Sequence, residues 1–162
     1  MRSATLILLS VVGLAAPGRA QETLPAAEVS AAFEAAGFSL VEGQWQSCGD
    51  PGTASYQPGA VAEVRDLDGD GQPEAVITEG SIFCFGGTEV GYALVSRQPD
   101  GEWRLVTQGA GMPRVLTTKG QDGWPDLEIG GPGFCFPVVR WNGREYALDR
   151  HQYDGRPCRP GG

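Results

Sequence analysis

The chain has 162 residues, of which 20 are acidic and 12 are basic, so its formal net charge is -8. This composition argues against a nucleic-acid partner, because holding a phosphate backbone needs clustered Lys and Arg. The length fits one domain, and the excess of carboxylates suits solubility and the binding of cations.

Residues 1–20 have the pattern of a secretory signal peptide. An apolar stretch, Leu6–Ala15, is followed by Gly18 and Ala20 at the −3 and −1 positions of a cleavage site. The stretch is shorter than the ~20 residues that span a bilayer, so no transmembrane segment is expected. We expect a periplasmic or extracellular protein in which residues 21–162 form a single β-rich domain.

The first predicted element of that domain is a short helix over residues 24–36. Thr23 is the expected N-cap, and Gly37 marks the end of the Ala-rich stretch. Val29 and Phe33 are four residues apart and therefore share one face of the helix. That face is expected to pack on the sheet that follows.

From Phe38 onward, short apolar runs alternate with Gly, Pro, Asp and Asn, which is typical of strands joined by tight turns. No second helix is expected. The two clearest hairpins are residues 92–97 with 102–106 around Asp100-Gly101, and residues 138–141 with 144–148 around Asn142-Gly143. In the second hairpin, alternation predicts one apolar face made of Val139, Trp141, Tyr146 and Leu148.

Four cysteines in an exported chain predict two disulfides. The alternative, a zinc site, is disfavoured because no pair has CxxC spacing and His151 is the single histidine. Of the three connectivities, the one that closes the nearer loops is favoured, and the other two stay open. It joins Cys48 to Cys84 and Cys135 to Cys158.

The sequence contains an internal repeat. The segment DGQPEAVITEGSIFCF from Asp70 aligns with DGWPDLEIGGPGFCF from Asp122 at an offset of 52 residues, which becomes 51 before the cysteine. Two copies of one unit are therefore expected, at about residues 60–106 and 114–149. Residues 61–65 and 114–117 are predicted as the strands that lead into the two loops, and each FCF segment is predicted as a strand.

Each copy has the size of a propeller blade, but two blades cannot close a ring. The expected fold is mainly β: two degenerate blade-like antiparallel units packed together, with the N-terminal helix against them and the disulfides as staples. A closed propeller is excluded by length.

The loop of the first copy predicts one structural Ca²⁺. Carboxylates occupy its positions 1, 3, 5 and 9, and Gly71 at position 6 permits a sharp reversal. Calcium prefers six to eight oxygens in a flexible shell. The expected ligands are the side chains of Asp66, Asp68, Asp70 and Glu74 and the backbone carbonyl of Gln72, with water completing the shell.

Three alternatives to this interpretation are weaker. An EF-hand would need a bidentate Glu at position 12, which is Ile77, and magnesium tolerates crowded all-protein shells poorly. In an acidic turn without metal, the Asp residues would only cap local backbone. Alternate Asp residues repel each other in the absence of a cation, which favours the ion.

The second copy is expected to hold no ion. Its positions 1 and 3 are Thr118 and Gly120, so only Asp122 and Asp126 offer carboxylates. Two carboxylates are too few for a calcium shell. Trp124 replaces Gln72, which indicates that this loop serves packing, with recognition as the weaker alternative.

Residues 61–78 resemble the FG-GAP or VCBS type of repeat, in which a DxDGDGxxD loop joins two strands of a propeller blade, as in integrin alpha subunits. Residues 114–130 are a weaker echo. The resemblance implies calcium ligation at the five positions named above, but Glu74 stands where Asp is usual. The whole chain, with AAGF, DLDGDGQPEAV, GWPDLEIGGPGFCFP and RWNG, also resembles a group of small uncharacterised secreted bacterial proteins, which implies no activity.

Aromatic residues offer a second candidate surface. Phe134 and Phe136 flank Cys135, and we interpret them as core packing around a disulfide rather than as a ligand surface. The four tryptophans, Trp45, Trp103, Trp124 and Trp141, have the same interpretation.

No catalytic residue is expected. His151, which follows the last predicted strand, could be combined with Asp154, Ser81 or Ser96, but no GxSxG or similar motif places them together. The sequence predicts a non-enzymatic calcium-stabilised module that binds a protein or glycan partner. The alternatives are a secreted inhibitor of a cell-wall enzyme or protease that presents residues 86–91 and, as a third choice, a metal-assisted hydrolase.

Overall fold

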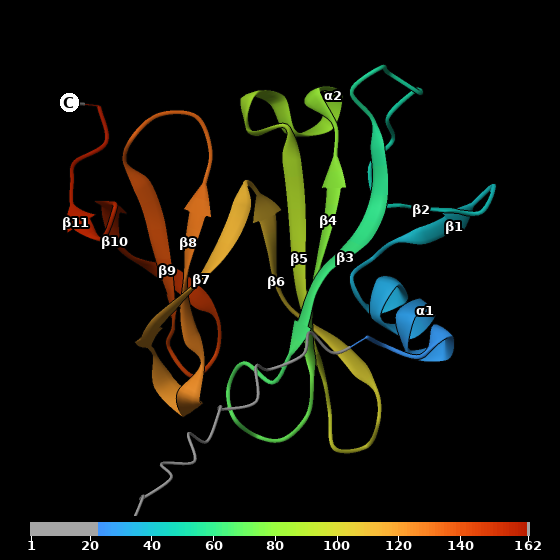
Figure 1. Cartoon of the computed structure of the whole chain (residues 1–162), viewed down its shortest axis with the longest axis horizontal. Helices are drawn as coiled ribbons and strands as arrows, with labels where there is room; N and C mark the ends of the chain where they lie inside the picture. Colours follow the sequence, from blue (N-terminus) through green and yellow to red (C-terminus); the bar gives the residue numbers. More distant parts are fainter. Residues whose placement is uncertain (1–22, 162) are drawn as a thin grey trace, which may run out of the picture.

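The computed structural model describes residues 23–161, so the predicted signal peptide lies outside the described residues (Figure 1). The helices are α1 (Ala26–Ala35) and α2 (Ile82–Phe85), and short 3-10 turns lie at Gly86–Thr88 and Gln121–Gly123. The strands are β1 (Ser39–Val41), β2 (Gln44–Gln46), β3 (Gln57–Arg65), β4 (Glu74–Gly80), β5 (Val90–Arg97), β6 (Trp103–Ala110), β7 (Met112–Lys119), β8 (Pro125–Gly130), β9 (Phe136–Trp141), β10 (Tyr146–Tyr153) and β11 (Arg156–Pro157). Neither helix is long and apolar enough to cross a membrane.

The strands form three antiparallel sheets, and none of these sheets closes on itself. The first sheet has the order β3-β4-β5-β6 and comes from the first repeat. The second sheet has the order β11-β10-β9-β8-β7, in which β7 to β10 come from the second repeat. A small hairpin of β1 and β2 is the third. The prediction of a mainly β fold of two units without ring closure is confirmed.

Helix α1 covers one face of the first sheet (Figure 1). Successive side chains of a strand point to opposite faces, and on β4 the buried Ala75 and Ile77 point toward the helix. There they pack with Phe33, whose ring stacks on Trp45. The predicted packing face of the helix, Val29 with Phe33, is therefore confirmed.

The opposite face of the first sheet packs on the second sheet. Val76 and Leu94 of the first sheet lie in one apolar cluster with Leu127 and Trp124 of the second. Because both faces of the first sheet are covered, its central strands β4 and β5 are buried along most of their length. The layers are thus α1, first sheet and second sheet, which appear from right to left in Figure 1.

The outer face of the second sheet carries charged side chains. Asp126 and Glu128 alternate with the inward-pointing Leu127, so they point away from the first sheet. Both carboxylates are buried, because arginine side chains from neighbouring strands lie over them. The outer face of the second sheet is therefore covered by an ion-pair network, whereas the outer face of the first sheet is covered by helix α1.

The ends of α1 differ in part from the prediction. The N-cap residue is Pro25, with no side-chain hydrogen bond, instead of Thr23. The reason is that the residue before a proline is disfavoured in helical conformation, so the helix cannot begin before Pro25. At the other end, Gly37 has a φ of 84°. The amide of Phe38 donates to the carbonyl of Phe33 at 2.9 Å, which completes the expected glycine termination.

The two FCF segments do not form the predicted strands. In the first copy the segment lies in helix α2, because Ser81 caps it by accepting from the amide of Cys84 at 3.0 Å. The expectation of no second helix is therefore wrong. In the second copy, Phe134 and Cys135 precede β9, and only Phe136 belongs to the strand.

The two disulfides are Cys48–Cys84 and Cys135–Cys158, so the favoured connectivity is confirmed. Each joins the cysteine of one FCF segment to a cysteine outside that repeat. Two disulfides indicate an oxidising, non-cytoplasmic compartment.

Candidate metal site

The first repeat loop runs from the end of β3 to the start of β4, and its own backbone amides hold it. Asp66 accepts hydrogen bonds from the amides of Gly69 at 2.7 Å and Gly71 at 3.1 Å. Both glycines have positive φ, 92° and 88°, a backbone conformation that side chains with a Cβ rarely adopt. The loop therefore curls around the Asp66 carboxylate.

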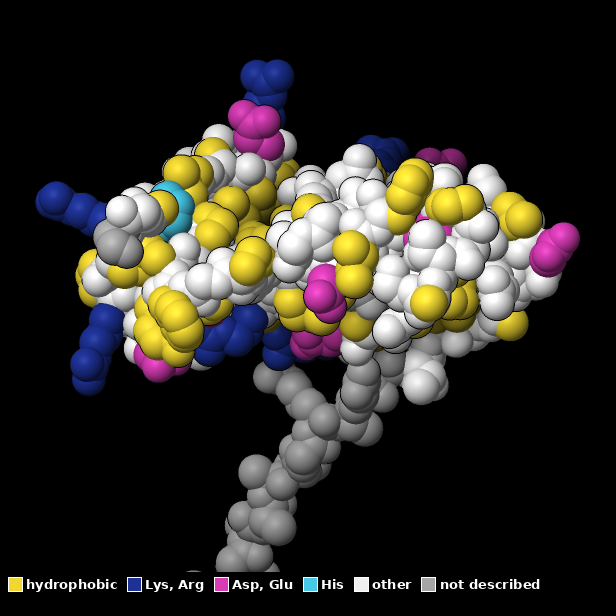
Figure 2. Space-filling model, turned by 90° about the horizontal axis from the view of Figure 1, so that it is seen from above, with side chains coloured by type: hydrophobic (Ala, Val, Ile, Leu, Met, Phe, Trp, Pro, Cys, Tyr) yellow, Lys and Arg dark blue, Asp and Glu magenta, His cyan; other side chains and the backbone are white. Residues whose placement is uncertain are grey.

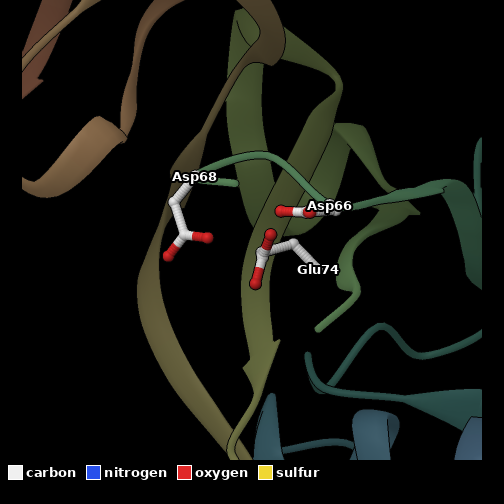
Figure 3. Close-up of side chains that lie close together, drawn as sticks. All are labelled: Asp66, Asp68 and Glu74. Carbon is white, nitrogen blue, oxygen red and sulfur yellow. The ribbon is translucent and has the colours of Figure 1, made fainter. Parts of the chain in front are cut away.

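Three carboxylates converge inside this curl (Figure 3). Asp66, Asp68 and Glu74 each offer one oxygen, and these oxygens lie within 4.8 Å of one another. Two ligands on opposite sides of a calcium ion, each at about 2.4 Å, would be ~4.8 Å apart. The three side chains could therefore hold a metal ion without rearrangement of the loop.

The other two predicted ligands do not belong to this group. Asp70 accepts from the backbone amide of Gln72 at 2.7 Å, and the side chain of Gln72 accepts from Arg97 at 2.8 Å. The structure thus brings together three of the five predicted residues. Ligation by Asp70 and by the carbonyl of Gln72 stays a prediction.

Glu74 is the most constrained of the three carboxylates. Its side chain is buried and accepts from the amide of Leu67 at 2.7 Å and from the hydroxyl of Ser96 at 2.8 Å. Burial raises the pKa of Glu74 to about 7, and the charges of Asp68 and Asp70 add to this rise, while the two hydrogen bonds oppose it. A cation at this place would remove the conflict, because it favours the ionised form.

Asp68 is affected in the same direction. Burial is the main reason why its pKa lies above the usual value, and the neighbouring charges of Asp70 and Asp66 contribute. Asp66 itself is exposed. The site therefore has one open side toward solvent, through which an ion and its waters could enter.

The first loop packs against the second repeat. Leu67, the second residue of the loop, is buried in the cluster that contains Trp124. A Cβ at Gly123 would overlap the carbonyl oxygen of Asp68, so the two loops touch backbone to backbone. The prediction that Trp124 has turned to packing is confirmed.

In the second loop, arginines occupy the role that a metal would have in the first. Asp126 aligns with Glu74, and it accepts from Arg140 at 2.8 and 2.9 Å, from Arg150 at 2.9 Å and from Thr118. Burial alone would raise the pKa of Asp126, but these hydrogen bonds outweigh it and hold the pKa well below its usual value. The sequence analysis missed both arginines, which lie 14 and 24 residues beyond Asp126. Arg140 lies on the predicted strand 138–141, which was a signal for it, whereas Arg150 lies beyond the last predicted strand, residues 144–148, so no predicted element placed it near Asp126.

The residues considered for catalysis are bonded elsewhere. Ser81 donates to Asp50, and Ser96 donates to Glu74. Both serines lie before the second sheet begins. His151 is half-buried within β10, which extends further than predicted. The structure does not bring these serines and the histidine together in the part of the chain that it describes.

The aromatic residues divide into buried and exposed groups. Trp103 and Trp124 are buried, and Trp45 and Trp141 are half-buried against the two cores, as predicted. Phe134, by contrast, is 75% exposed, so its assignment to the core is wrong. Its ring forms an edge-to-face pair with the exposed Tyr153, with a centroid distance of 5.5 Å.

No family model, no curated protein and no solved structure matches this chain. The FG-GAP resemblance therefore stays a prediction.

Proposed function

We propose that this protein is a non-enzymatic module of the periplasm or cell exterior that is stabilised by one calcium ion and binds a protein or glycan partner. The convergence of Asp66, Asp68 and Glu74 at the junction of the two repeats supports the ion above all else. All three donors are hard oxygens on a glycine-rich loop, a donor set that suits calcium. The FG-GAP resemblance of this loop agrees with that choice.

The ion has a structural role in this proposal. It would neutralise carboxylates that otherwise repel each other, and it would hold the loop that carries Leu67 into the core between the sheets. At free calcium a hundredfold above its dissociation constant, the gain in unfolding free energy is about 2.7 kcal/mol. For a domain of this size, such a gain raises Tm by roughly 10 °C.

Thermal unfolding in calcium and in chelator tests the ion. We expect Tm to rise with calcium in the unmodified protein and to lose most of that response in Asp68→Asn, because this change removes one of the three converging charges. Asp122→Asn is the matched control, since it removes an exposed carboxylate from the second loop. A Tm that is the same in calcium and in chelator would falsify the structural role of the ion.

A binding role is supported by exposed aromatic side chains on one edge of the molecule. Phe83 and Phe134 are the first residues of the two FCF segments, and they are 65% and 75% exposed, the highest fractions among the exposed large hydrophobic residues. The turns beside them touch, since Gly87 lies against Pro132 and Gly131 against Thr88. Figure 2 views the molecule from this side and shows hydrophobic side chains at several places on it.

Substitution of these two phenylalanines tests whether their rings stabilise the fold or are free to bind a partner. Phe83→Ser and Phe134→Ser are expected to change the unfolding free energy by less than ~0.5 kcal/mol, because exposed side chains contribute little to it. Loss of more than about 2 kcal/mol in either variant would show that the ring is part of the core, which contradicts a binding role. The measurement is urea unfolding of both variants in calcium.

The second candidate function is a secreted inhibitor of a cell-wall enzyme or protease. The observation that favours it is the exposed turn Gly86–Thr88, which Cys84 anchors through its disulfide and which ends at Glu89 with a φ of 60°. Such a turn is fixed in shape before any partner binds, which lowers the entropic cost of association. An inhibitor would form a one-to-one complex that is lost when this turn is replaced by a flexible Gly-Ser segment.

A further inference from the structure

The last two residues of β5 hold the segment by which the first repeat loop enters β4. The hydroxyl of Ser96 donates to the carboxylate of Glu74 at 2.8 Å. The amide of Arg97 donates to the carbonyl of Pro73 at 3.0 Å, and Nη1 of its guanidinium donates to the side chain of Gln72 at 2.8 Å. Three successive residues of the loop and β4 are therefore fixed by two successive residues of β5.

The side chains of Ser96 and Arg97 act from opposite faces of the first sheet. Leu94 of the same strand lies in the apolar cluster between the two sheets, and Val95 lies in the cluster under helix α1. Successive side chains of a strand alternate, so Ser96 points toward the second sheet and Arg97 toward the helix. The end of the metal loop is thus held from the helix side as well as from the side of Glu74.

Glu28, in the first turn of α1, holds the guanidinium of Arg97. Its Oε2 accepts from Nε of Arg97 at 3.2 Å and from the indole of Trp103 at 2.6 Å, and its Oε1 accepts from Nη2 of Arg97 at 3.3 Å. The Arg97 and Glu28 side chains are only 32% and 28% exposed, so the pair is partly shielded from water. Two nitrogens of the guanidinium bind the helix, and the third binds Gln72.

The first turn of α1 depends on this contact for its docking. The N-cap residue Pro25 makes no side-chain hydrogen bond, and the buried residues of the helix, Ala32 and Phe33, lie in its second half. A helix of ten residues is marginal in water without tertiary contacts. A shift of Arg97 would therefore change both the position of Gln72 and the docking of the first turn.

We propose that Arg97 is a positioning residue of the metal loop and that it couples calcium binding to the docking of helix α1. The inference rests on the proposed calcium ion. With Glu28 bound, the charge of Arg97 is neutralised and its guanidinium is oriented toward Gln72, so the backbone that leads into Glu74 is fixed before an ion binds. Because such coupling is reciprocal, calcium in turn stabilises the docked first turn.

Isothermal titration calorimetry of the chelator-treated protein with calcium tests this coupling. Glu28→Gln should raise the dissociation constant about fivefold, the effect of one hydrogen bond to a charged group, because Arg97 loses its anchor and its charge is no longer neutralised. Glu34→Gln is the matched control, since it removes an exposed carboxylate from the same helix. It should leave the dissociation constant unchanged, and equal dissociation constants in the two variants refute the coupling.

The same experiment distinguishes failure of the coupling from failure of the calcium site. If the unmodified protein binds no calcium, the proposed function fails and the coupling fails with it. If it binds calcium with the same affinity as Glu28→Gln, only the coupling fails. A lower Tm of Glu28→Gln in chelator, without a change in calcium affinity, would show that Glu28 has only a structural role.

Arg97→Lys separates position from charge. Lysine keeps the positive charge, but its ammonium cannot reproduce the planar fork that reaches Glu28 and Gln72 together. We expect the calcium dissociation constant to rise at least about threefold. A dissociation constant equal to that of the unmodified protein would show that the charge alone matters, which refutes the positioning role.

Hydrogen exchange gives a second measurement, at the helix itself. Saturating calcium should slow exchange of the α1 amides about fivefold in the unmodified protein, because the coupling free energy is the same in both directions. In Glu28→Gln the slowing should be less than about twofold, because the link through Arg97 is lost. Equal slowing in the two proteins, or none in the unmodified protein, contradicts the proposal.

Discussion

The two repeat loops solve the same electrostatic problem in opposite ways. Each places a buried carboxylate at position 9, Glu74 in the first loop and Asp126 in the second. Around Glu74 gather further carboxylates, and its pKa rises to about 7. Around Asp126 gather two guanidinium groups, and its pKa falls. In the second loop, arginines of the same unit supply the positive charge, whereas in the first loop a bound metal ion would have to supply it.

The second loop shows how side chains of the same unit can stabilise a buried carboxylate at position 9. The second loop holds its cations covalently, as Arg140 and Arg150 of the neighbouring strands. It therefore keeps its shape at any metal concentration. In our proposal the first loop takes its cation from solution. It touches the second loop where the backbone of Asp68 meets Gly123.

The largest expected effect comes from removing the buried carboxylate of the second loop. Asp126→Ala leaves two partly buried guanidinium groups without their main partner, which costs about 3 kcal/mol of unfolding free energy. Because arginines supply the charge, the loss should be the same in calcium and in chelator. Urea unfolding under both conditions measures it.

Asp149→Ala is the control for that variant, since it removes a half-exposed carboxylate from the same network. It should cost less than ~1 kcal/mol, because partly exposed ion pairs contribute little. A loss in Asp126→Ala that calcium restores would mean that the second loop also depends on metal.

The pH dependence of the unfolding free energy in the metal-free protein tests the first loop. With its pKa near 7 in the folded state and about 4.5 when unfolded, Glu74 binds more protons in the folded chain between these values. The unfolding free energy in chelator should therefore fall as pH rises from 5 to 7.5, by about 2 kcal/mol. Glu74→Gln, which stays neutral, should remove this slope, as should saturating calcium, which keeps the carboxylate ionised. A slope that persists in Glu74→Gln would assign it to another group.

The last prediction tests the contact between the two loops. Gly123→Ala combines the strain of a positive φ with overlap of the Asp68 carbonyl oxygen, and it should cost about 2 kcal/mol and weaken calcium binding several-fold. Gly155→Ala carries the strain alone, because Gly155 also has positive φ but no neighbour within 4 Å. It should cost ~1 kcal/mol and leave the calcium affinity unchanged. Equal calcium affinities in the two variants would show that the loops are not coupled.

Features set by local chemistry were the ones that the sequence predicted well. The turns at Asp100-Gly101 and Asn142-Gly143, the end of α1 at Gly37 and the fold class all follow from residues that are close together in the chain. The convergence of Asp66, Asp68 and Glu74 also lies within nine residues, and alternation toward the inside of a curled loop was enough to anticipate it.

Features set by distant partners were missed. The four-residue helix α2 is capped by Ser81, which is itself held by Asp50, 31 residues away, and a short apolar run does not distinguish helix from strand. Likewise, Glu79 is buried because Tyr56 and the amides of Ser47 and Cys48 bind it, which no spacing rule reveals. Phe134 was placed in the core because composition says which side chains are apolar, but not which of them the sheets can reach.

The charged outer layer of the second sheet limits what can be added to the molecule. If the layers continued as they begin, a third sheet would stack on Asp126 and Glu128 with an apolar face, as the second sheet stacks on Val76 and Leu94. Stacking an apolar face there would desolvate several ionised groups, and apolar contacts would not offset that free-energy cost. The outer face of the second sheet is therefore a poor surface for apolar stacking, whether by another sheet or by a second copy of the chain.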